Sequence, residues 1–255
     1  MSSILDAFKL DGKAAIVTGA NKGLGQAIAL GLAEAGANII AVARGDLGET
    51  VDRVSSLGRK AVAVNADLGD RSTFDGIFEA GKAEFGGVDI LVNNAGIIRR
   101  DDFTNFSEKD WDEVMRVNID AVFFLSQRFA RQCLERHVKG KIINVASMLS
   151  FQGGIRVPSY TASKSAVMGL TRLMVCELGP KGLTANAIAP GYMATDNTQQ
   201  LRDDAVRNKA ILERIPVGRW GSPDDLKGAA VFLASSASDY VNGYTIAVDG
   251  GWLAR

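Results

Sequence analysis

Three side chains in the second half of the chain could together move a proton to or from a substrate oxygen. Tyr160 and Lys164 stand four residues apart in a stretch with helical periodicity, so they lie on one face of a predicted helix. Ser147 comes just after the apolar run 142–145 and therefore lies at the carboxyl end of a predicted strand. Because ligands of open α/β folds bind at that edge of the sheet, a phenol, an ammonium and a hydroxyl are predicted to meet there.

These three groups suit the reduction of a ketone by hydride transfer. Hydride delivered to the carbonyl carbon builds negative charge on the oxygen, which then needs a hydrogen-bond donor and a proton. Ser147 can supply the hydrogen bond and Tyr160 the proton. Because a free phenol has a pKa of about 10, we expect the Lys164 ammonium to favour the phenolate and lower the pKa of Tyr160. The alternative is that Tyr160 and Lys164 are only an exposed stripe on a helix.

A glycine-rich turn near the N-terminus is a candidate site for a dinucleotide. Residues 14–18 form an apolar run, residues 19–25 contain three glycines, and a helical pattern follows directly. Glycines let the backbone approach a pyrophosphate closely, and the N-terminus of the following helix offers free N–H groups. The residues of this turn predicted to contact a nicotinamide coenzyme are Gly19, Asn21, Lys22, Gly23, Leu24 and Gly25.

Two cations bear on which coenzyme this turn would bind. In dinucleotide folds an acidic residue near the end of the second strand binds the ribose hydroxyls of NAD, whereas an arginine there accommodates the 2′-phosphate of NADP. Arg44 holds that position, and together with Lys22 it favours NADP(H). The alternative is that both are solvated surface charges and that Asp46 reaches a ribose.

Short apolar runs alternate with longer amphipathic stretches along the chain. The pattern predicts strands at 14–18, 39–43, 61–65, 90–93, 141–146, 184–188 and 245–248, and helices at 25–35, 48–57, 74–85, 111–136, 160–178 and 224–234. This alternation implies an α/β, Rossmann-type, doubly wound parallel sheet of seven strands with helices on both faces. No linker or repeat interrupts it, so residues 1–255 are predicted to form a single domain. The polar segment 194–214 is predicted to be a substrate lid.

The composition argues against several kinds of partner. The 29 basic and 29 acidic residues leave no net charge to attract nucleic acid or an anionic membrane. Residues 1–13 lack a secretory pattern, no run is long enough to span a membrane, and the two cysteines, Cys133 and Cys176, fit reduced thiols, so we expect a cytoplasmic protein. His137 is the only histidine and there is no Cys/His cluster, so we expect no metal site.

From residue 10 to the C-terminus the chain resembles the short-chain dehydrogenase/reductase family. The resemblance rests on motifs in the family's order: the turn 18–25, Asn93-Asn94-Ala95-Gly96, Asn118, Ser147, Tyr160 with Lys164, and Pro190-Gly191 followed by Thr195. It implies an NAD(P)-dependent oxidoreductase with Asn118, Ser147, Tyr160 and Lys164 as its catalytic tetrad. Asn118 would support a proton relay through Lys164, which would also hold the nicotinamide ribose.

The resemblance also implies further coenzyme contacts. Asp67 would meet the adenine, Asn93 the adenosine ribose region, and the stretch 190–195 the nicotinamide and the phosphates. The contacts predicted beyond the glycine turn are Arg44, Asp67, Leu68, Asn94, Ala95, Gly96, Tyr160, Lys164, Pro190, Gly191, Met193 and Thr195. A homotetramer is implied as well, and the apolar tail 250–253 suits contact with a neighbouring subunit.

Within the family, residues 91–100, 146–164 and 232–255 resemble members that interconvert a ketone and a secondary alcohol on a small sugar acid in uronate breakdown. Such members imply NAD(H), in conflict with the two cations described above. A guanidinium can hold a carboxylate through paired hydrogen bonds. The predicted substrate contacts are Ser147, Gln152, Arg156, Tyr160, Arg99 and Arg100, with Arg156 the first candidate for the carboxylate. Each arginine could instead be a surface or subunit-contact charge.

Two other functions fit the same residues. A related short-chain reductase acting on gluconate, on 3-oxoacyl thioesters or on other ketones would share every tetrad residue, and only the substrate-side stretches separate it. A catalytically idle dinucleotide-binding regulator would keep the fold. The intact tetrad argues against this last alternative.

Overall fold

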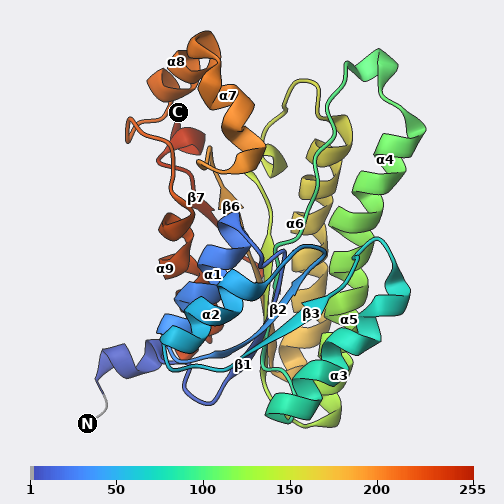
Figure 1. The fold of residues 1–255 in the computed structure, drawn as a ribbon, viewed down its shortest axis with the longest axis vertical. Helices are drawn as coiled ribbons and strands as arrows, with labels where there is room; N and C mark the ends of the chain where they lie inside the picture. Colours follow the sequence, from blue (N-terminus) through green and yellow to red (C-terminus); the bar gives the residue numbers. More distant parts are fainter. Residues whose placement is uncertain (1–2) are drawn as a thin grey trace.

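The computed structural model describes residues 3–255 and contains, within them, one sheet of seven parallel strands. The strands are ordered β3-β2-β1-β4-β5-β6-β7 (Figure 1). Their bounds are β1 Ala14–Thr18, β2 Asn38–Ala43, β3 Ala61–Asn65, β4 Ile90–Asn93, β5 Gly140–Val145, β6 Leu183–Pro190 and β7 Thr245–Val248. The order reverses between β1 and β4, and such a reversal opens a crevice at the carboxyl ends of the strands. The predicted doubly wound parallel sheet is therefore confirmed.

Helices cover both faces of the sheet (Figure 1). One face carries α1 Gly23–Glu34, α2 Gly48–Ser56 and α9 Lys227–Ala234. The other carries α3 Phe74–Phe85, α5 Ala121–Glu135 and α6 Pro158–Leu178, and α4 Glu108–Met115 packs against α6. Two further helices, α7 Gln199–Asp203 and α8 Ala205–Arg214, lie together at one end of the molecule.

Successive residues of the central strand β1 face opposite helical layers. Ala15 and Val17 belong to the apolar cluster formed with α1 and α9, whereas Ala14 and Ile16 belong to the cluster formed with α3 and α5. Every residue of β1 is buried, because a parallel sheet covered on both faces has no solvent side. This buried strand fixes the position of the turn that follows it.

The long helix predicted at 111–136 is interrupted. Helices α4 and α5 are joined by a π-helical turn, Arg116–Asp120, which sequence periodicity did not indicate. The predicted strands 14–18, 61–65, 90–93 and 245–248 match the structure, and β6 continues beyond its predicted end to Pro190. The polar segment 194–214 folds largely as α7 and α8, and the side chain of Asp204 caps α8 by accepting hydrogen bonds from its first N–H groups.

The C-terminal tail packs against its own chain. The Trp252 side chain is 5% exposed and meets the ring of Tyr192 edge-on, with ring centroids 4.8 Å apart. The guanidinium of Arg214 lies 4.0 Å from the centroid of the Trp252 ring. The expectation that this part of the tail is available to a neighbouring subunit is therefore wrong for the Trp252 side chain.

Between residues 3 and 255 no helix combines the length and the apolar character needed to cross a membrane. The same part of the chain contains no group of three or more His, Cys, Asp or Glu side chains that could hold a metal ion. Cys133 is buried and Cys176 is exposed, and both thiols are free.

Candidate active site

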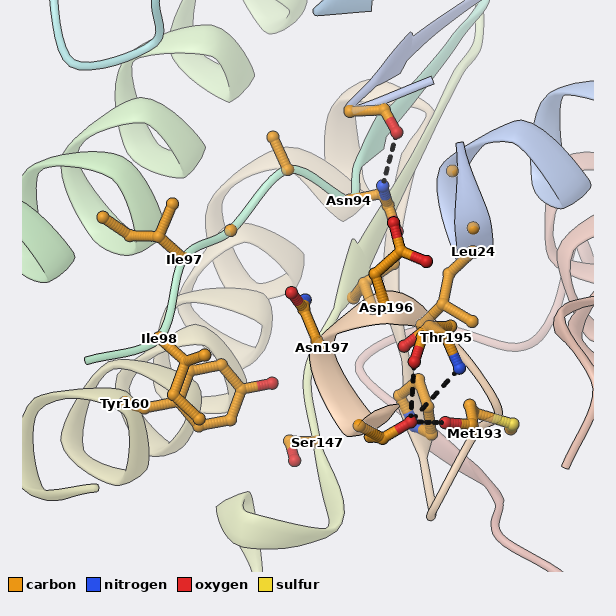
Figure 2. A pocket seen from close by; sticks show the side chains of 18 of the residues that line it. Leu24, Asn94, Ile97, Ile98, Ser147, Tyr160, Met193, Thr195, Asp196 and Asn197 are labelled. Atoms are coloured by element: carbon orange, nitrogen blue, oxygen red, sulfur yellow. Dashed lines mark hydrogen bonds between the residues drawn. The ribbon is translucent and has the colours of Figure 1, made fainter. Parts of the chain in front are cut away.

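A cavity of about 980 Å³ follows the carboxyl edge of the sheet. Its walls come from the segments after β1, β2, β4, β5 and β6 and from the start of the predicted lid. Figure 2 shows the phenol of Tyr160 and the side chain of Asn197 pointing into it. The turn predicted to bind a coenzyme and the side chains predicted to protonate an oxygen therefore share one cavity.

The turn after β1 has room only for glycine at its narrowest points. Gly19 and Gly23 have φ values of +67° and +59°, a left-handed conformation that side chains disfavour. A Cβ at Gly25 would overlap the carbonyl oxygen of Gly19 and the side-chain amide of Asn94. Because Lys22, the residue before α1, does not cap the helix with its side chain, the first N–H groups of α1 have no side-chain partner there. A glycine-rich turn whose backbone can be approached closely, at the positive end of a helix, fits a dinucleotide pyrophosphate.

Asn94 joins the end of β4 to the end of β1 where the strand order reverses. Its side-chain amide donates to the carbonyl oxygen of Thr18 at 2.8 Å. The backbone N–H groups of Asn94 and Ala95 both donate to the hydroxyl of Thr18 at 3.0 Å. These bonds hold the loop of Asn94, Ala95 and Gly96 against the glycine-rich turn, so that both border the cavity.

All but one of the predicted coenzyme residues line the cavity, namely Gly19, Asn21, Lys22, Gly23, Leu24, Gly25, Arg44, Asp67, Leu68, Asn94, Ala95, Gly96, Tyr160, Lys164, Pro190, Gly191, Met193 and Thr195. Asn93, which the resemblance also placed at the coenzyme, is not among the lining residues. It is 3% exposed, and its side-chain amide donates to Ser126 and Asn144 between the sheet and the helices.

Each of the two cations predicted to favour NADP(H) faces a carboxylate. Lys22 Nζ lies 2.7 Å from an oxygen of Asp196, and a guanidinium nitrogen of Arg44 lies 4.0 Å from an oxygen of Asp67. All four side chains are more than half exposed. The cations are therefore accessible to a phosphate, but the carboxylates already offset their charge.

Ser147 and Lys164 are buried at the part of the cavity formed by the segment after β5 and by α6. Ser147 is 7% exposed, and its hydroxyl oxygen accepts from the N–H of Leu149 at 3.2 Å, which leaves the hydroxyl proton available for donation. Lys164 is 4% exposed, and its ammonium donates to the carbonyl oxygen of Val145 at 2.6 Å. Tyr160 stands in the first turn of α6, and the Lys164 ammonium lies 5.7 Å from the centroid of its ring.

Burial dominates the ionisation of both groups. It raises the pKa of Tyr160, while a hydrogen bond with Ser147 and the charge of Arg100 act in the opposite direction. Burial also lowers the pKa of Lys164 to about 8. The groups that oppose burial at Tyr160 are Ser147 and Arg100, while the Lys164 ammonium is held by the Val145 carbonyl, so the expectation that Lys164 lowers the pKa of the phenol stays a prediction.

Asn118 lies behind the cavity wall, within the π-helical turn. Its side-chain oxygen accepts from the N–H of Ile97 at 2.9 Å, and its amide donates to the carbonyl oxygen of Ile97 at 3.0 Å and to the Ser163 hydroxyl at 3.1 Å. A Cβ added to Gly96 would lie 3.2 Å from the Asn118 side-chain oxygen and 3.6 Å from the Lys164 ammonium. Asn118 therefore approaches Lys164 across Gly96, and it fixes the loop after β4 directly.

The predicted substrate residues divide into two groups. Ser147, Tyr160, Arg100 and Arg156 line the cavity, whereas the structure does not bring Arg99 or Gln152 into it. The guanidinium of Arg99 donates to both carboxylate oxygens of Glu113, at 3.1 and 2.9 Å. The Gln152 side-chain oxygen accepts from Arg214 at 3.3 Å.

The two predicted substrate arginines that line the cavity, Arg100 and Arg156, each contact a neighbouring residue. Arg156 has a φ of 62°, which is unusual for a residue with a side chain, and its guanidinium lies 3.1 Å from a carboxylate oxygen of Asp102. Arg100 donates to the backbone carbonyl of Asn197 at 3.3 Å. Strained backbone of this kind concentrates at binding and catalytic sites.

Several lining residues escaped the sequence reasoning, namely Ile97, Ile98, Asp196, Asn197 and Arg207. Ile97 and Ile98 follow the Asn-Asn-Ala-Gly motif directly, so continuing that motif by two residues would have found them. Asp196, Asn197 and Arg207 fall inside the predicted lid, but a polar segment gives no signal of which side chains turn inward.

Comparison with known proteins places the chain among nicotinamide-dependent enzymes. Residues 19–253 match the protein family described as Enoyl-(Acyl carrier protein) reductase. The chain is 63% identical to 2-dehydro-3-deoxy-D-gluconate 5-dehydrogenase of Dickeya dadantii, over 99% of this chain and 100% of that protein.

Solved structures agree in fold along the whole chain. A candidate 2-deoxy-D-gluconate 3-dehydrogenase from Agrobacterium tumefaciens with bound NADP is 57% identical, with a TM-score of 0.93 over 98% of this chain and 100% of that one. A gluconate 5-dehydrogenase from Burkholderia cenocepacia, in complex with NADP and tartrate, is 41% identical with a TM-score of 0.93 over 99% of this chain and 100% of that one.

Proposed function

Because the chain belongs to the short-chain dehydrogenase/reductase family, we propose that it interconverts the 5-ketone and the 5-alcohol of a 3-deoxy-2-keto sugar acid, as a 2-dehydro-3-deoxy-D-gluconate 5-dehydrogenase does. It is an NAD(P)-dependent oxidoreductase that acts on CH–OH groups. The observation that carries the choice of substrate is that one cavity contains both the Ser147 and Tyr160 hydroxyls and the guanidinium groups of Arg100 and Arg156. A substrate with a carbonyl to reduce and a carboxylate to hold matches this combination.

The chain's own residues account for the proton that a ketone must gain. Ser147 donates a hydrogen bond to the substrate oxygen as charge develops on it, because its own oxygen already accepts from Leu149. Tyr160 donates the proton, and burial keeps its phenol protonated at neutral pH. The bound nicotinamide supplies or accepts the hydride. In the oxidative direction the phenolate of Tyr160 removes the proton from the alcohol, while Ser147 stays hydrogen-bonded to the same oxygen.

Lys164 and Asn118 hold the coenzyme loop and the groups around the phenol in position. Lys164 is anchored to the end of β5 through Val145 and lies between the phenol and Gly96 of the coenzyme loop, where its ammonium can hold a ribose hydroxyl. Asn118 keeps that loop in place through both polar groups of Ile97. We infer that these two residues complete the catalytic tetrad.

The coenzyme preference that we propose is NADP(H). Lys22 and Arg44 both line the cavity, and no acidic residue takes the place of Arg44 directly after β2. Asp46 accepts from the N–H of Gly48 at 2.9 Å and does not line the cavity, which weakens the case for a ribose contact. NAD(H) remains the alternative that the activity assay decides.

We propose that segment 194–214 acts as a lid over the substrate. Thr195, Asp196 and Asn197 line the cavity, and α7 and α8 follow them at its edge.

We further propose a homotetramer, for which the exposed apolar side chains of Trp111, Phe123, Leu173, Tyr240 and Tyr244 offer contact area. Light scattering of the purified protein measures the assembly state directly, and a monomeric mass would contradict it.

Initial rates of NADPH and NADH oxidation, measured with a panel of ketones, test the proposed function. The panel contains 5-keto sugar acids, a neutral ketone of similar size and a 3-oxoacyl thioester. We expect the highest kcat/KM with a keto sugar acid, and we expect Tyr160→Phe to reduce that turnover by about 100-fold or more. Higher kcat/KM with the thioester would replace the proposed substrate, and turnover unaffected by Tyr160→Phe would remove the phenol from the chemistry.

A further inference from the structure

Ser150 links the loop that carries Ser147 to the helix that carries Tyr160 and Lys164. Its hydroxyl donates to the backbone carbonyl of Lys164 at 2.6 Å. The same oxygen accepts from the backbone N–H of Ser147 at 3.3 Å. One half-buried side chain thus contacts the main chain of two members of the proposed tetrad.

The second of these contacts belongs to a reciprocal pair at the 3-10 turn Met148–Ser150. The Ser147 hydroxyl accepts from the first N–H groups of the turn, and the Ser150 hydroxyl accepts from the N–H of Ser147 in return. Such a reciprocal arrangement fixes the backbone at the start of a helical turn. The direction of the Ser147 side chain therefore depends on the Ser150 hydroxyl.

Lys164 is tied to the same stretch of chain at two points. Its backbone carbonyl accepts from Ser150, and its ammonium donates to the carbonyl oxygen of Val145 at 2.6 Å. These two bonds join both ends of the segment 145–150 to Lys164, and Ser147 lies within that segment. The bonds of Lys164 to Val145 and to Ser150 therefore set the distance between Ser147 and the first turns of α6.

We propose that Ser150 is a positioning residue for the ketone reduction, which holds Ser147 at a fixed distance from Tyr160 and Lys164. The inference rests on the proposed function, since that assigns the hydrogen bond to Ser147 and the proton to Tyr160. The hydroxyl must donate to a carbonyl and accept from an N–H at once, and alanine can do neither. Misplacement of a reacting group by about 1 Å can cost about 100-fold in rate.

Three variants separate positioning from packing. Ser150→Ala removes both hydrogen bonds, whereas Ser150→Thr keeps the hydroxyl. Ser235→Ala is the matched control, because the buried Ser235 hydroxyl also donates to a helix carbonyl, that of Phe232 at 2.9 Å, and Ser235 does not line the cavity. If Ser150→Ala does not fold, Ser150→Cys replaces it, since a thiol is a similar-sized but weak donor.

The measurements are kcat and KM for a keto sugar acid, the Kd of the coenzyme, and hydrogen exchange of residues 145–151. For Ser150→Ala we expect kcat to fall by about tenfold or more, coenzyme Kd to change by less than about twofold, and amide exchange across 145–151 to accelerate. We expect Ser150→Thr to recover most of kcat and the slow exchange. Ser235→Ala should lower thermal stability without lowering kcat.

Two results overturn the proposal. One is an unchanged kcat in Ser150→Ala, and the other is a Ser150→Thr variant as impaired as Ser150→Ala. A wild-type protein that turns over no sugar acid would contradict the proposed function instead. In that case hydrogen exchange still decides the role of Ser150, because equal exchange of residues 145–151 in wild type and Ser150→Ala would show that the hydroxyl does not hold this loop.

Discussion

The Lys22 ammonium lies 2.7 Å from the Asp196 carboxylate and so joins the glycine-rich turn to the start of the lid segment across 174 residues of sequence. Lys22 is also a candidate partner for the 2′-phosphate of NADP. A carboxylate and a phosphate would then compete for the same ammonium. The proposed lid and a bound NADP would thereby be coupled through one side chain.

We therefore expect Asp196→Asn to lower the KM for NADPH by about two- to fivefold, with a smaller change for NADH. Steady-state kinetics with each coenzyme at saturating substrate measure this. Asp203→Asn is the control, because Asp203 is an exposed lid carboxylate that accepts from Gln199 rather than Lys22. A raised KM for NADPH in Asp196→Asn would contradict the competition.

Arg44→Gln tests the coenzyme preference at the end of β2. Loss of the guanidinium should lower kcat/KM with NADPH by about tenfold or more and leave kcat/KM with NADH nearly unchanged, because only NADPH carries the 2′-phosphate. Arg53→Gln provides the comparison, since Arg53 is a nearby cation of α2 that does not line the cavity. Equal losses of kcat/KM with NADPH and NADH would mean that Arg44 does not bind the 2′-phosphate.

Arg156→Ala tests the proposed carboxylate contact. We expect the KM for a keto sugar acid to rise by about 10-fold or more, and the KM for a neutral ketone to change much less, because only the acid offers a charge to the guanidinium. Arg99→Ala serves as the control, since Arg99 is bound to Glu113 outside the cavity. The carboxylate role is lost if both substrates respond to Arg156→Ala to the same extent.

Arg100→Gln should shift the pH dependence of turnover. The positive charge of Arg100 lowers the pKa of Tyr160 against the effect of burial, so its removal raises that pKa further. Reduction needs the protonated phenol, so its rate should persist to higher pH in the variant. Oxidation needs the phenolate and should begin at higher pH. Profiles of kcat against pH in both directions measure the shift, and an unmoved profile would mean that another group controls it.

The buried Lys164 makes the stability of the unliganded protein depend on pH. Its pKa is about 8 in the folded protein against an ordinary value of 10.5, so between these pH values the unfolded chain retains a proton that the folded chain has lost. Raising the pH across this window should therefore increase the free energy of unfolding of the wild type by about 3 kcal/mol relative to Lys164→Met.

Urea denaturation of wild type and Lys164→Met at several pH values measures this difference. Lys181→Met, which replaces an exposed lysine, should follow the wild type at every pH. Parallel curves for wild type and Lys164→Met would show that Lys164 keeps its ordinary pKa in the folded protein.

Much of the fold could be predicted because buried parallel strands leave a simple pattern. The apolar runs of β1, β3, β4 and β7 end at polar or glycine residues, and their bounds follow directly. The end of β6 was missed because Pro190 looks like a break. In the structure Pro190 is the last residue of the strand and pairs with Val248.

The candidate site was less predictable where the direction of a side chain decides its role. Tyr160, Ser147 and Lys164 follow from strand ends and helix spacing. Arg99 and Arg100 are neighbours in an extended segment, so one meets Glu113 and the other lines the cavity, and nothing in their order says which. The raised pKa of Tyr160 also lay beyond the sequence, because it reflects how much chain covers the phenol.

The π-helical turn Arg116–Asp120 has a consequence for the length of related chains. A π-turn accommodates an extra residue compared with regular α-helical winding. Deleting a residue such as Val117 would restore that winding without rotating α5 relative to α4, because the π-turn absorbs the extra residue. Leu125 and Phe129 would then stay in the core, whereas Asn118 would move to another place on the helix and its amide would miss the backbone of Ile97. The number of residues in this turn therefore distinguishes related sequences in which an asparagine side chain can bond the loop after β4, as Asn118 does, from sequences that share only the fold.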